Sequence, residues 1–255
     1  MRVPAVAGMF YPDEGIKLLG MIKELLGQCK KASIKGRLRG LIVPHAGYIF
    51  SGIVAAAGYN IVLSRKEEID KIILIGPSHY MMFNGAASSG EDVWETPLGM
   101  VEVHELIGRH IVPFPRAHVE EHSLEVQVPF LQVVCPSARI YPLVTGEVDP
   151  SMLAKDIEQY IDDRTLILVS SDLSHYYPYY KAVEIDSKAN ECIPSLNIEC
   201  VNEKVEACGK TGILTLMHIA KDMGWKGQLI DYKNSGDTYK DKSQVVGYGC
   251  YAFFE

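Results

Sequence analysis

Residues 71–79 read KIILIGPSH, a nearly continuous apolar run followed by Gly-Pro and then a histidine. A short apolar run of this kind is typical of a strand that is buried on both faces of a sheet. Residues 39–45 (RGLIVPH) and 165–175 (TLILVSSDLSH) repeat the arrangement, and each also ends on a histidine. Further strands are predicted at RIYPLVTG (139–146), IDYK (230–233) and VVGYGCYAFF (245–254). The chain is therefore predicted to fold around a central, largely parallel or mixed β-sheet.

Amphipathic stretches separate these strands, with apolar residues recurring at intervals of three and four. Helices are predicted over residues 15–28, 52–64, 102–111, 123–134, 150–162, 180–193 and 211–223. Ser123 and Asp149 are predicted helix N-caps. Strands alternating with helices favour a layered α/β sandwich in which helices flank the sheet. Because no linker, repeat or low-complexity segment interrupts the pattern, a single domain over residues 1–255 is expected.

The composition excludes several classes of protein. The apolar share of 47% and the charged share of 22% are those of a globular protein, and the net charge is −7. Nucleic acids and anionic membranes require clustered basic residues, so neither is an expected partner. The chain has no apolar run of roughly 20 residues and its first residues do not resemble a signal peptide, so the cytoplasm is the expected location.

The six cysteines are scattered along the chain without a CxxC pair. This spacing indicates neither a disulfide scaffold nor a zinc knuckle, and free thiols are expected.

Three histidines share one position relative to the predicted strands. His45, His79 and His175 each follow the last apolar residue of a strand. Ligands of open α/β sheets bind outside the carboxyl ends of the strands, where residues distant in sequence come together. A cluster of imidazoles there indicates a metal site or acid–base chemistry. The alternative is that each histidine is an ordinary loop residue.

Cys208 is predicted to lie at a helix N-terminus, because it precedes Gly209 and the periodic run TGILTLMHIA. The helix dipole and free N–H groups favour a thiolate at such a position. A thiolate can bind a metal or attack an electrophile. An inert buried thiol is the alternative.

Two carboxylates lie near histidines in the sequence. His122 and Glu125 can share one helical face, so the pair can orient groups around a metal, although a capping turn with an acidic face has the same pattern. Asp172 precedes His175 by three residues and can accept a hydrogen bond from an imidazole or form an Asx-turn.

Other motifs are absent or incomplete. The segment Gly209-Lys210-Thr211 is similar to the end of a phosphate-binding loop, but Lys204 stands where that loop requires glycine. Neither a GxSxG elbow nor an HExxH helix occurs. The four remaining histidines are expected to serve packing or the surface: His104, His110, His118 and His218.

Six motifs extend over nearly the whole chain in a characteristic order: VPHAGYIFSG, ILIGPSHY, ETPLG, EHSLEVQVPF, SSDLSHY and ACGKTG. In this order they resemble the Memo family. The resemblance implies an α/β fold similar to that of the class III extradiol ring-cleaving dioxygenases.

The resemblance also implies a metal site. His45 and His79 would be ligands, with Cys208 as the third, and the metal would be a redox ion, iron(II) or copper. The dioxygenases use a carboxylate as the third ligand, and a sulfur ligand makes the site softer.

Three further residues match positions of the family pattern. His175 would correspond to the acid–base histidine of the dioxygenases, and His122 to a pocket histidine that contacts substrate or oxygen. Asp172 matches the aspartate of the family's SSD motif.

Two classes of function follow from the resemblance. The first is a dioxygenase-like redox enzyme that acts on a small molecule. The second is a non-catalytic protein that handles metal or binds a peptide or partner through the same pocket. The family also suggests a radical-SAM protein and a small companion domain as partners.

Overall fold

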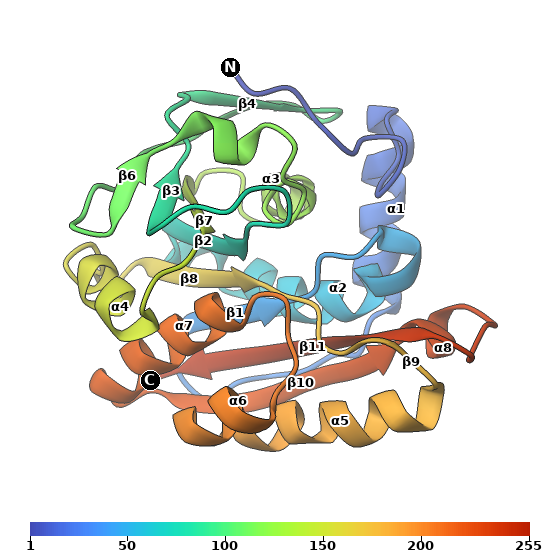
Figure 1. The fold of residues 1–255 in the computed structure, drawn as a ribbon. Coiled ribbons are helices and arrows are strands. Elements are labelled where there is room, and N and C mark those ends of the chain that lie inside the picture. Colours follow the sequence, from blue (N-terminus) through green and yellow to red (C-terminus); the bar gives the residue numbers. More distant parts are fainter.

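The three strands that end in histidine-bearing loops are neighbours in a computed structural model that describes residues 1–255 (Figure 1). β8 (Thr165–Ser170) lies between β1 (Leu38–Val43) and β2 (Lys71–Pro77), and all three strands are parallel. Val43 lies opposite Ser170, and Ile75 lies opposite Val169. Parallel strands in this register end at the same edge of the sheet, about 5 Å apart.

The complete sheet has nine strands and is mixed. Its order is β10-β11-β1-β8-β2-β7-β3-β6, and β9 pairs with β11. β11 is antiparallel to β1, and β7 is parallel to β2. The remaining strands of this sheet are β3 (Ala86–Ser88), β6 (Ile111–Pro113), β7 (Arg139–Thr145), β9 (His175–Tyr177), β10 (Lys226–Asn234) and β11 (Val245–Phe254). A separate hairpin pairs β4 (Val93–Thr96) with β5 (Gly99–Glu102).

Helices cover both faces of the sheet, so side chains of successive strand residues enter two different cores. On β2, Ile72 and Leu74 belong to one hydrophobic cluster, and Ile73 and Ile75 belong to the other. The first cluster includes residues of α1 (Gly15–Gln28), α2 (Tyr48–Ser64) and α3 (Val128–Val134). The second includes residues of α4 (Pro150–Glu158), α5 (Tyr179–Cys192), α6 (Ile198–Lys204) and α7 (Lys210–Asp222). The predicted layered α/β fold is thereby confirmed.

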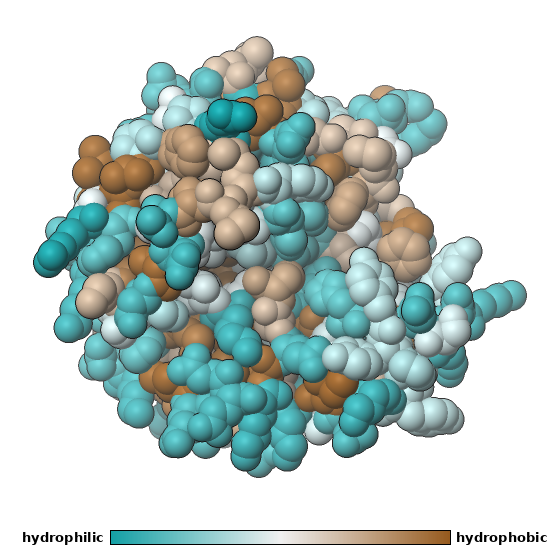
Figure 2. All heavy atoms as spheres, viewed as in Figure 1, coloured by the Kyte–Doolittle hydropathy of each residue, from teal (hydrophilic) through white to brown (hydrophobic).

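The surface seen in Figure 2 is mostly hydrophilic, with hydrophobic residues in small groups. No helix combines the length and the apolar character that spanning a membrane requires.

Most predicted elements are confirmed. All six predicted strands form, and residues 71–77 and 245–254 have the predicted bounds. Asp149 caps α4, since its side chain accepts hydrogen bonds from the backbone N–H groups of Ser151 and Met152. Ser123 is not an N-cap; its hydroxyl donates to the carbonyl of Pro77, and a 3-10 turn (Glu125–Gln127) precedes α3.

The predicted helix over residues 102–111 is wrong. Val103 forms a bridge with Ile140, which extends the chain along β7, and the backbone of Gly108 then pairs with Ile111 in a turn. The buried Leu106 satisfies the apolar pattern from an irregular segment. Tertiary contacts therefore override the local periodicity here.

The expectation that all cysteines are free is also wrong. Cys192 at the end of α5 and Cys200 in α6 form a disulfide across a separation of eight residues. The turn between the two helices brings their Cα atoms to 5.9 Å, which is within the usual range for a disulfide. Four cysteines remain free: Cys29, Cys135, Cys208 and Cys250.

A buried ion pair fixes the N-terminal segment to the loop before α3. Arg2 Nη2 lies 2.7 Å from Glu125 Oε2, and the Glu125 side chain is 1% exposed. The same carboxylate accepts hydrogen bonds from the backbone N–H groups of Ala5 and Val6 and from the Tyr11 hydroxyl. Glu125 therefore holds the first eleven residues against the protein body.

We expect Glu125→Ala to lower the free energy of unfolding by about 3–5 kcal/mol, because it leaves Arg2 charged, buried and without its partner. Chemical denaturation followed by circular dichroism measures this change. Glu14→Ala is the control, since Glu14 belongs to an exposed pair with Lys17 and its loss should cost less than about 1 kcal/mol. Equal losses in the two variants would contradict the role of Glu125.

Candidate metal centre

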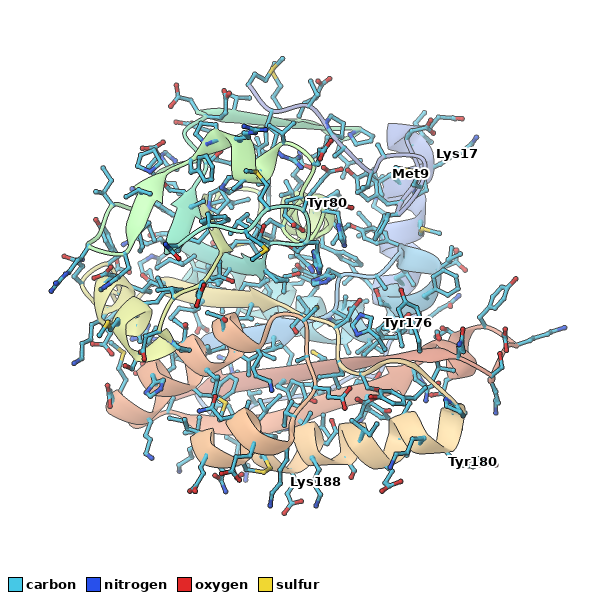
Figure 3. All side chains as sticks on the ribbon, in the orientation of Figure 1. Met9, Lys17, Tyr80, Tyr176, Tyr180 and Lys188 are labelled. Carbon is cyan, nitrogen blue, oxygen red and sulfur yellow. A yellow bond between two sulfur atoms is a disulfide. The ribbon has the colours of Figure 1, made fainter.

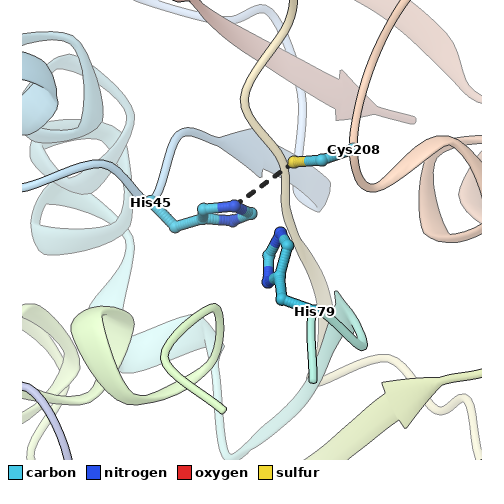
Figure 4. Close-up of side chains that lie close together, drawn as sticks. All are labelled: His45, His79 and Cys208. Carbon is cyan, nitrogen blue, oxygen red and sulfur yellow. Dashed lines mark hydrogen bonds between the residues drawn. The ribbon is translucent and has the colours of Figure 1, made fainter. Parts of the chain in front are cut away.

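Two histidines and a cysteine meet at the carboxyl ends of the central strands. His45 follows β1, His79 follows β2, and Cys208 directly precedes the N-terminus of α7. His45 Nε2 lies 3.2 Å from Cys208 Sγ, and the imidazole centroids of His45 and His79 are 5.2 Å apart. In Figure 4 both imidazoles point toward the space beside the sulfur. The three side chains offer ligand atoms that all lie within 4.8 Å of one another.

A glycine allows Cys208 to approach the sheet. A Cβ atom on Gly209 would lie 2.7 Å from the carbonyl oxygen of Ser170 and from Cβ of Ser171. The backbone N–H of Cys208 donates to the carbonyl of Asp172, and the N–H of Asp172 donates to Cys208 Sγ. These contacts bring the sulfur to the end of β8.

The hydrogen bonds around His45 determine its tautomer. Gln127 Nε2 donates to the carbonyl of Pro44 and to Ser170 Oγ. Ser170 Oγ in turn donates its single proton to the carbonyl of Ser123. At its 3.0 Å contact with His45 Nδ1, Ser170 Oγ can therefore only accept, and His45 Nδ1 carries the proton. The lone pair is then on Nε2, which faces the cysteine and is the atom that can bind a metal.

Glu121 determines the tautomer of His79 in the same way. One carboxylate oxygen lies 2.9 Å from His79 Nδ1 and also accepts from the backbone N–H of Ser123. The other oxygen accepts from the backbone N–H of His79. A carboxylate only accepts, so His79 Nδ1 is protonated and Nε2 is free to bind a metal. A carboxylate behind a histidine is a common support of metal ligands.

Electrostatics keep the imidazole of His45 neutral and the carboxylate of Glu121 ionised in the absence of metal. Burial, assisted by the neighbouring His79, lowers the pKa of His45 to about 3. Burial alone would raise the pKa of Glu121, but hydrogen bonds from His79 and Ser123 outweigh it and lower that pKa to about 2. Glu121 is therefore ionised and able to accept both bonds from His79 at neutral pH.

The cysteine departs from the sequence-based expectation. Burial, followed by the charge of Asp172, raises the pKa of the Cys208 thiol to about 12. Cys208 lies at the start of α7 as predicted, but without a metal its thiol is protonated, because burial outweighs the helix N-terminus. A bound metal would displace this proton, as metals do with coordinating thiols.

The other predicted residues surround the same space. The ring of His122 stacks on His79 at 4.6 Å, and burial followed by the charge of His45 lowers its pKa to about 4. Asp172 is 4% exposed, and its Oδ1 accepts from the backbone N–H groups of His45 and Ala46. His175 lies on β9 opposite Val246 and does not belong to the group of close ligand atoms.

The six predicted site residues line one cavity of about 650 Å³: His45, His79, His122, Asp172, His175 and Cys208. The cavity also reaches the N-terminal segment through Phe10, whose ring centroid lies 4.8 Å from that of His122. The four histidines expected to serve packing or the surface do not line it.

The supporting residues could not be identified from the sequence. The pairing of His122 with Glu125 is interpreted as a support for a metal site or as a capping turn with an acidic face, whereas Glu125 points to the N-terminal segment and Glu121 supports His79. Glu121 is adjacent to His122 in the sequence, but no spacing rule distinguishes it from Glu120 or Glu125. Ser170 and Gln127 gave no signal, because a serine at a strand end and a glutamine in a helical turn are common.

Two imidazole nitrogens and a sulfur form a set that suits borderline and soft transition metals and leaves positions open for other ligands. His79, Glu121 and His122 also lie within reach of one ion. The Glu121 oxygens already accept three hydrogen bonds, however, so the set with Cys208 is the more available one.

Known proteins resemble this chain over almost its full length. The model of the Memo family, described as Memo-like protein, matches residues 2–252. A MEMO1 family protein of Desulfurococcus amylolyticus is 36% identical over 282 residues, with 99% of each chain covered. One of Aquifex aeolicus is 37% identical over 266 residues, with 97% of each chain covered. Among solved structures, the uncharacterized protein JW3007 of Escherichia coli K12 aligns with a TM-score of 0.47 and 9% identity, covering 86% of this chain and 100% of that one. The sequence matches over almost the full length show that this chain belongs to the Memo family.

Proposed function

We propose that the protein is a redox metalloenzyme in which His45, His79 and Cys208 bind one iron(II) or copper ion beside a substrate pocket. The observation that carries the proposal is the pair of fixed tautomers. Independent hydrogen-bond partners leave both histidines with a free Nε2 at a cavity that also contains a cysteine sulfur. A bound ion would supply one-electron or oxygen chemistry, which the side chains alone cannot perform.

The remaining pocket residues have roles that need no direct bond to the metal. His175 moves a proton to or from the substrate, as a histidine outside the ligand set can do. The low pKa of His122 keeps its imidazole neutral, so it can accept a hydrogen bond from a substrate. Asp172 fixes the loop that carries His45, because it binds the backbone N–H groups of His45 and Ala46.

A metal-handling or partner-binding protein without catalysis is the second candidate. The observation that favours it is the cysteine, since the related dioxygenases use a carboxylate and sulfur suits copper(I) transfer as well as redox chemistry. Oxygen uptake by metal-loaded protein across a panel of catechols and small thiols separates the two functions. Uptake that depends on His175 supports the enzyme.

Elemental analysis of protein isolated without oxygen or chelator is the primary test. About one iron or copper ion per chain is expected. Two results would refute the redox proposal. One is a protein that contains zinc alone, and the other is a protein that contains no metal and takes up none during anaerobic loading.

We expect His45→Ala, His79→Ala and Cys208→Ser each to weaken metal binding at least about a hundredfold, because each removes a ligand atom. Competition with a chromophoric chelator measures the affinity. Bound metal should also protect Cys208 from alkylation. His218→Ala, on the same helix that follows Cys208 but outside the cavity, is the control. Parent affinity in the three variants would refute the site.

Glu121→Ala should weaken metal binding by about 10- to 100-fold without removing a ligand, because His79 loses the partner that fixes its tautomer and ring. Glu121→Gln should lie between this variant and the parent, since the amide oxygen can still accept from His79 Nδ1. Glu120→Ala is the matched control, because Glu120 is exposed. A Glu121→Ala variant with the parent affinity and an unchanged melting temperature would show that His79 needs no support.

His175→Ala should retain the metal and lose about 10² to 10⁴ in the rate of any turnover, as expected for an acid–base group. The metal content is measured on the same sample as the oxygen uptake. Loss of the metal in this variant would instead identify His175 as a ligand.

A further inference from the structure

Aromatic side chains form much of the pocket wall beyond the histidines. Six phenylalanine and tyrosine residues line it: Phe10, Phe50, Tyr80, Tyr176, Tyr239 and Tyr248. The rings of Phe50 and Tyr239 meet edge to face at 5.6 Å, and Phe10 contacts His122. Planar rings of a ligand bind well against such walls through stacked and edge-to-face contacts.

Three of these tyrosines present their rings at the mouth of the pocket. Tyr80, Tyr176 and Tyr239 are each more than half exposed. Figure 3 shows Tyr80 and Tyr176 on the same face of the molecule, and both line the cavity. Tyr176 has a φ of 64°, a left-handed conformation that costs free energy for a tyrosine and often occurs at ligand-binding sites. Exposed aromatic faces attract cations.

The charged residues that line the pocket are acidic. Asp172 and Asp241 line it, and no lysine or arginine does. Asp172 is nine-tenths buried, and both of its hydrogen bonds from His45 and Ala46 end on Oδ1, so Oδ2 has no protein partner. Asp241 likewise uses only Oδ1, which accepts from the backbone N–H and hydroxyl of Ser243. Each carboxylate therefore has one oxygen available to a ligand.

Two lysines lie next to Asp241 in the sequence but do not neutralise the pocket. Lys242 Nζ is held over the ring of Tyr179, 4.3 Å from its centroid, and Tyr179 does not line the cavity. Lys240 is exposed and also lies outside the lining. Apart from a metal ion held by His45, His79 and Cys208, an anionic ligand would thus meet two carboxylates in the pocket and no basic side chain to pair with.

We propose that the pocket selects an aromatic amine, a molecule with a planar ring and a protonated amino group, over an aromatic carboxylate or phosphate. The inference extends the proposed function by assigning a substrate class to the same site. Aromatic walls bind the ring, while the rim tyrosines and the free carboxylate oxygens bind the ammonium group.

Binding of three matched phenols to the full-length protein tests the charge preference. Tyramine is cationic, 4-ethylphenol is neutral and 3-(4-hydroxyphenyl)propionate is anionic, while their rings are the same. Ligand-observed NMR titration at low ionic strength should give tyramine an affinity at least about tenfold above that of the propionate, with 4-ethylphenol between them. Competition among the phenols should show one shared site.

Substitutions identify the residues that cause the preference for the cationic phenol. Asp241→Asn should reduce the ratio of tyramine to propionate affinity at least about threefold and leave 4-ethylphenol unchanged. Asp163→Asn, an exposed acid outside the cavity, should not alter the ratio. Phe10→Leu should weaken all three phenols together, because it removes ring contacts and no charge.

The proposal fails if the propionate binds as well as tyramine, if none of the phenols binds, or if Asp241→Asn and Asp163→Asn have equal effects. Elemental analysis of the same sample separates this outcome from the metal proposal. A protein that takes up no metal on anaerobic loading and still prefers tyramine refutes only the metal centre, whereas a metal-loaded protein that prefers the propionate refutes only the substrate class.

Discussion

The parallel pairing of β1, β8 and β2 is the constraint on which the site depends. Because Val43 is opposite Ser170 and Ile75 is opposite Val169, the three strands end at one level. The next residues of each chain segment must then leave the sheet at the same edge, within about one or two strand spacings of each other. The backbone hydrogen bonds of the sheet bring His45, Asp172 and His79 to one edge, and the Asp172 carboxylate then fixes the loop that carries His45.

Proximity alone would not make a metal site, because each imidazole could present the wrong nitrogen. Two different hydrogen-bond partners select the nitrogen that each imidazole presents. Ser170, whose proton is committed to Ser123, acts on His45 from within the sheet, and Glu121 acts on His79 from the loop before α3. Ser123 takes part in both, through its carbonyl and its backbone N–H, so one short turn fixes two candidate ligands. Gly76 permits that turn, since a Cβ atom there would lie 2.7 Å from Ser123 Oγ.

The features that could be predicted from the sequence depend only on residues that are close together in the chain. Buried strands such as residues 71–77 are apolar runs in the sequence, and the histidines that follow three of these strands can be located without a structure. The failures all depend on partners distant in the sequence. The segment 102–111 has helical periodicity but extends along β7, and the disulfide forms only because a turn brings α6 back to the end of α5. Glu121 and Glu125 are equivalent by pattern, and only the position of the N-terminal segment and of β2 decides which of them faces the histidine.

These two glutamates also show how far the pocket depends on the complete chain. Glu125 binds Arg2 and the backbone N–H groups of Ala5 and Val6. Arg2 also donates to the backbone carbonyl of Glu121, the residue that supports His79. The N-terminal segment thus stabilises the same turn that orients a candidate ligand, and it then brings Phe10 to the cavity wall. At the other end of the chain, β11 contributes Val246 and Tyr248 to the same cavity. A pocket whose walls come from residue 10 and residue 248 forms only when both ends of the chain have docked. The candidate metal site should therefore be a property of the fully folded protein, and a change in the first residues can alter it without contact with a ligand atom.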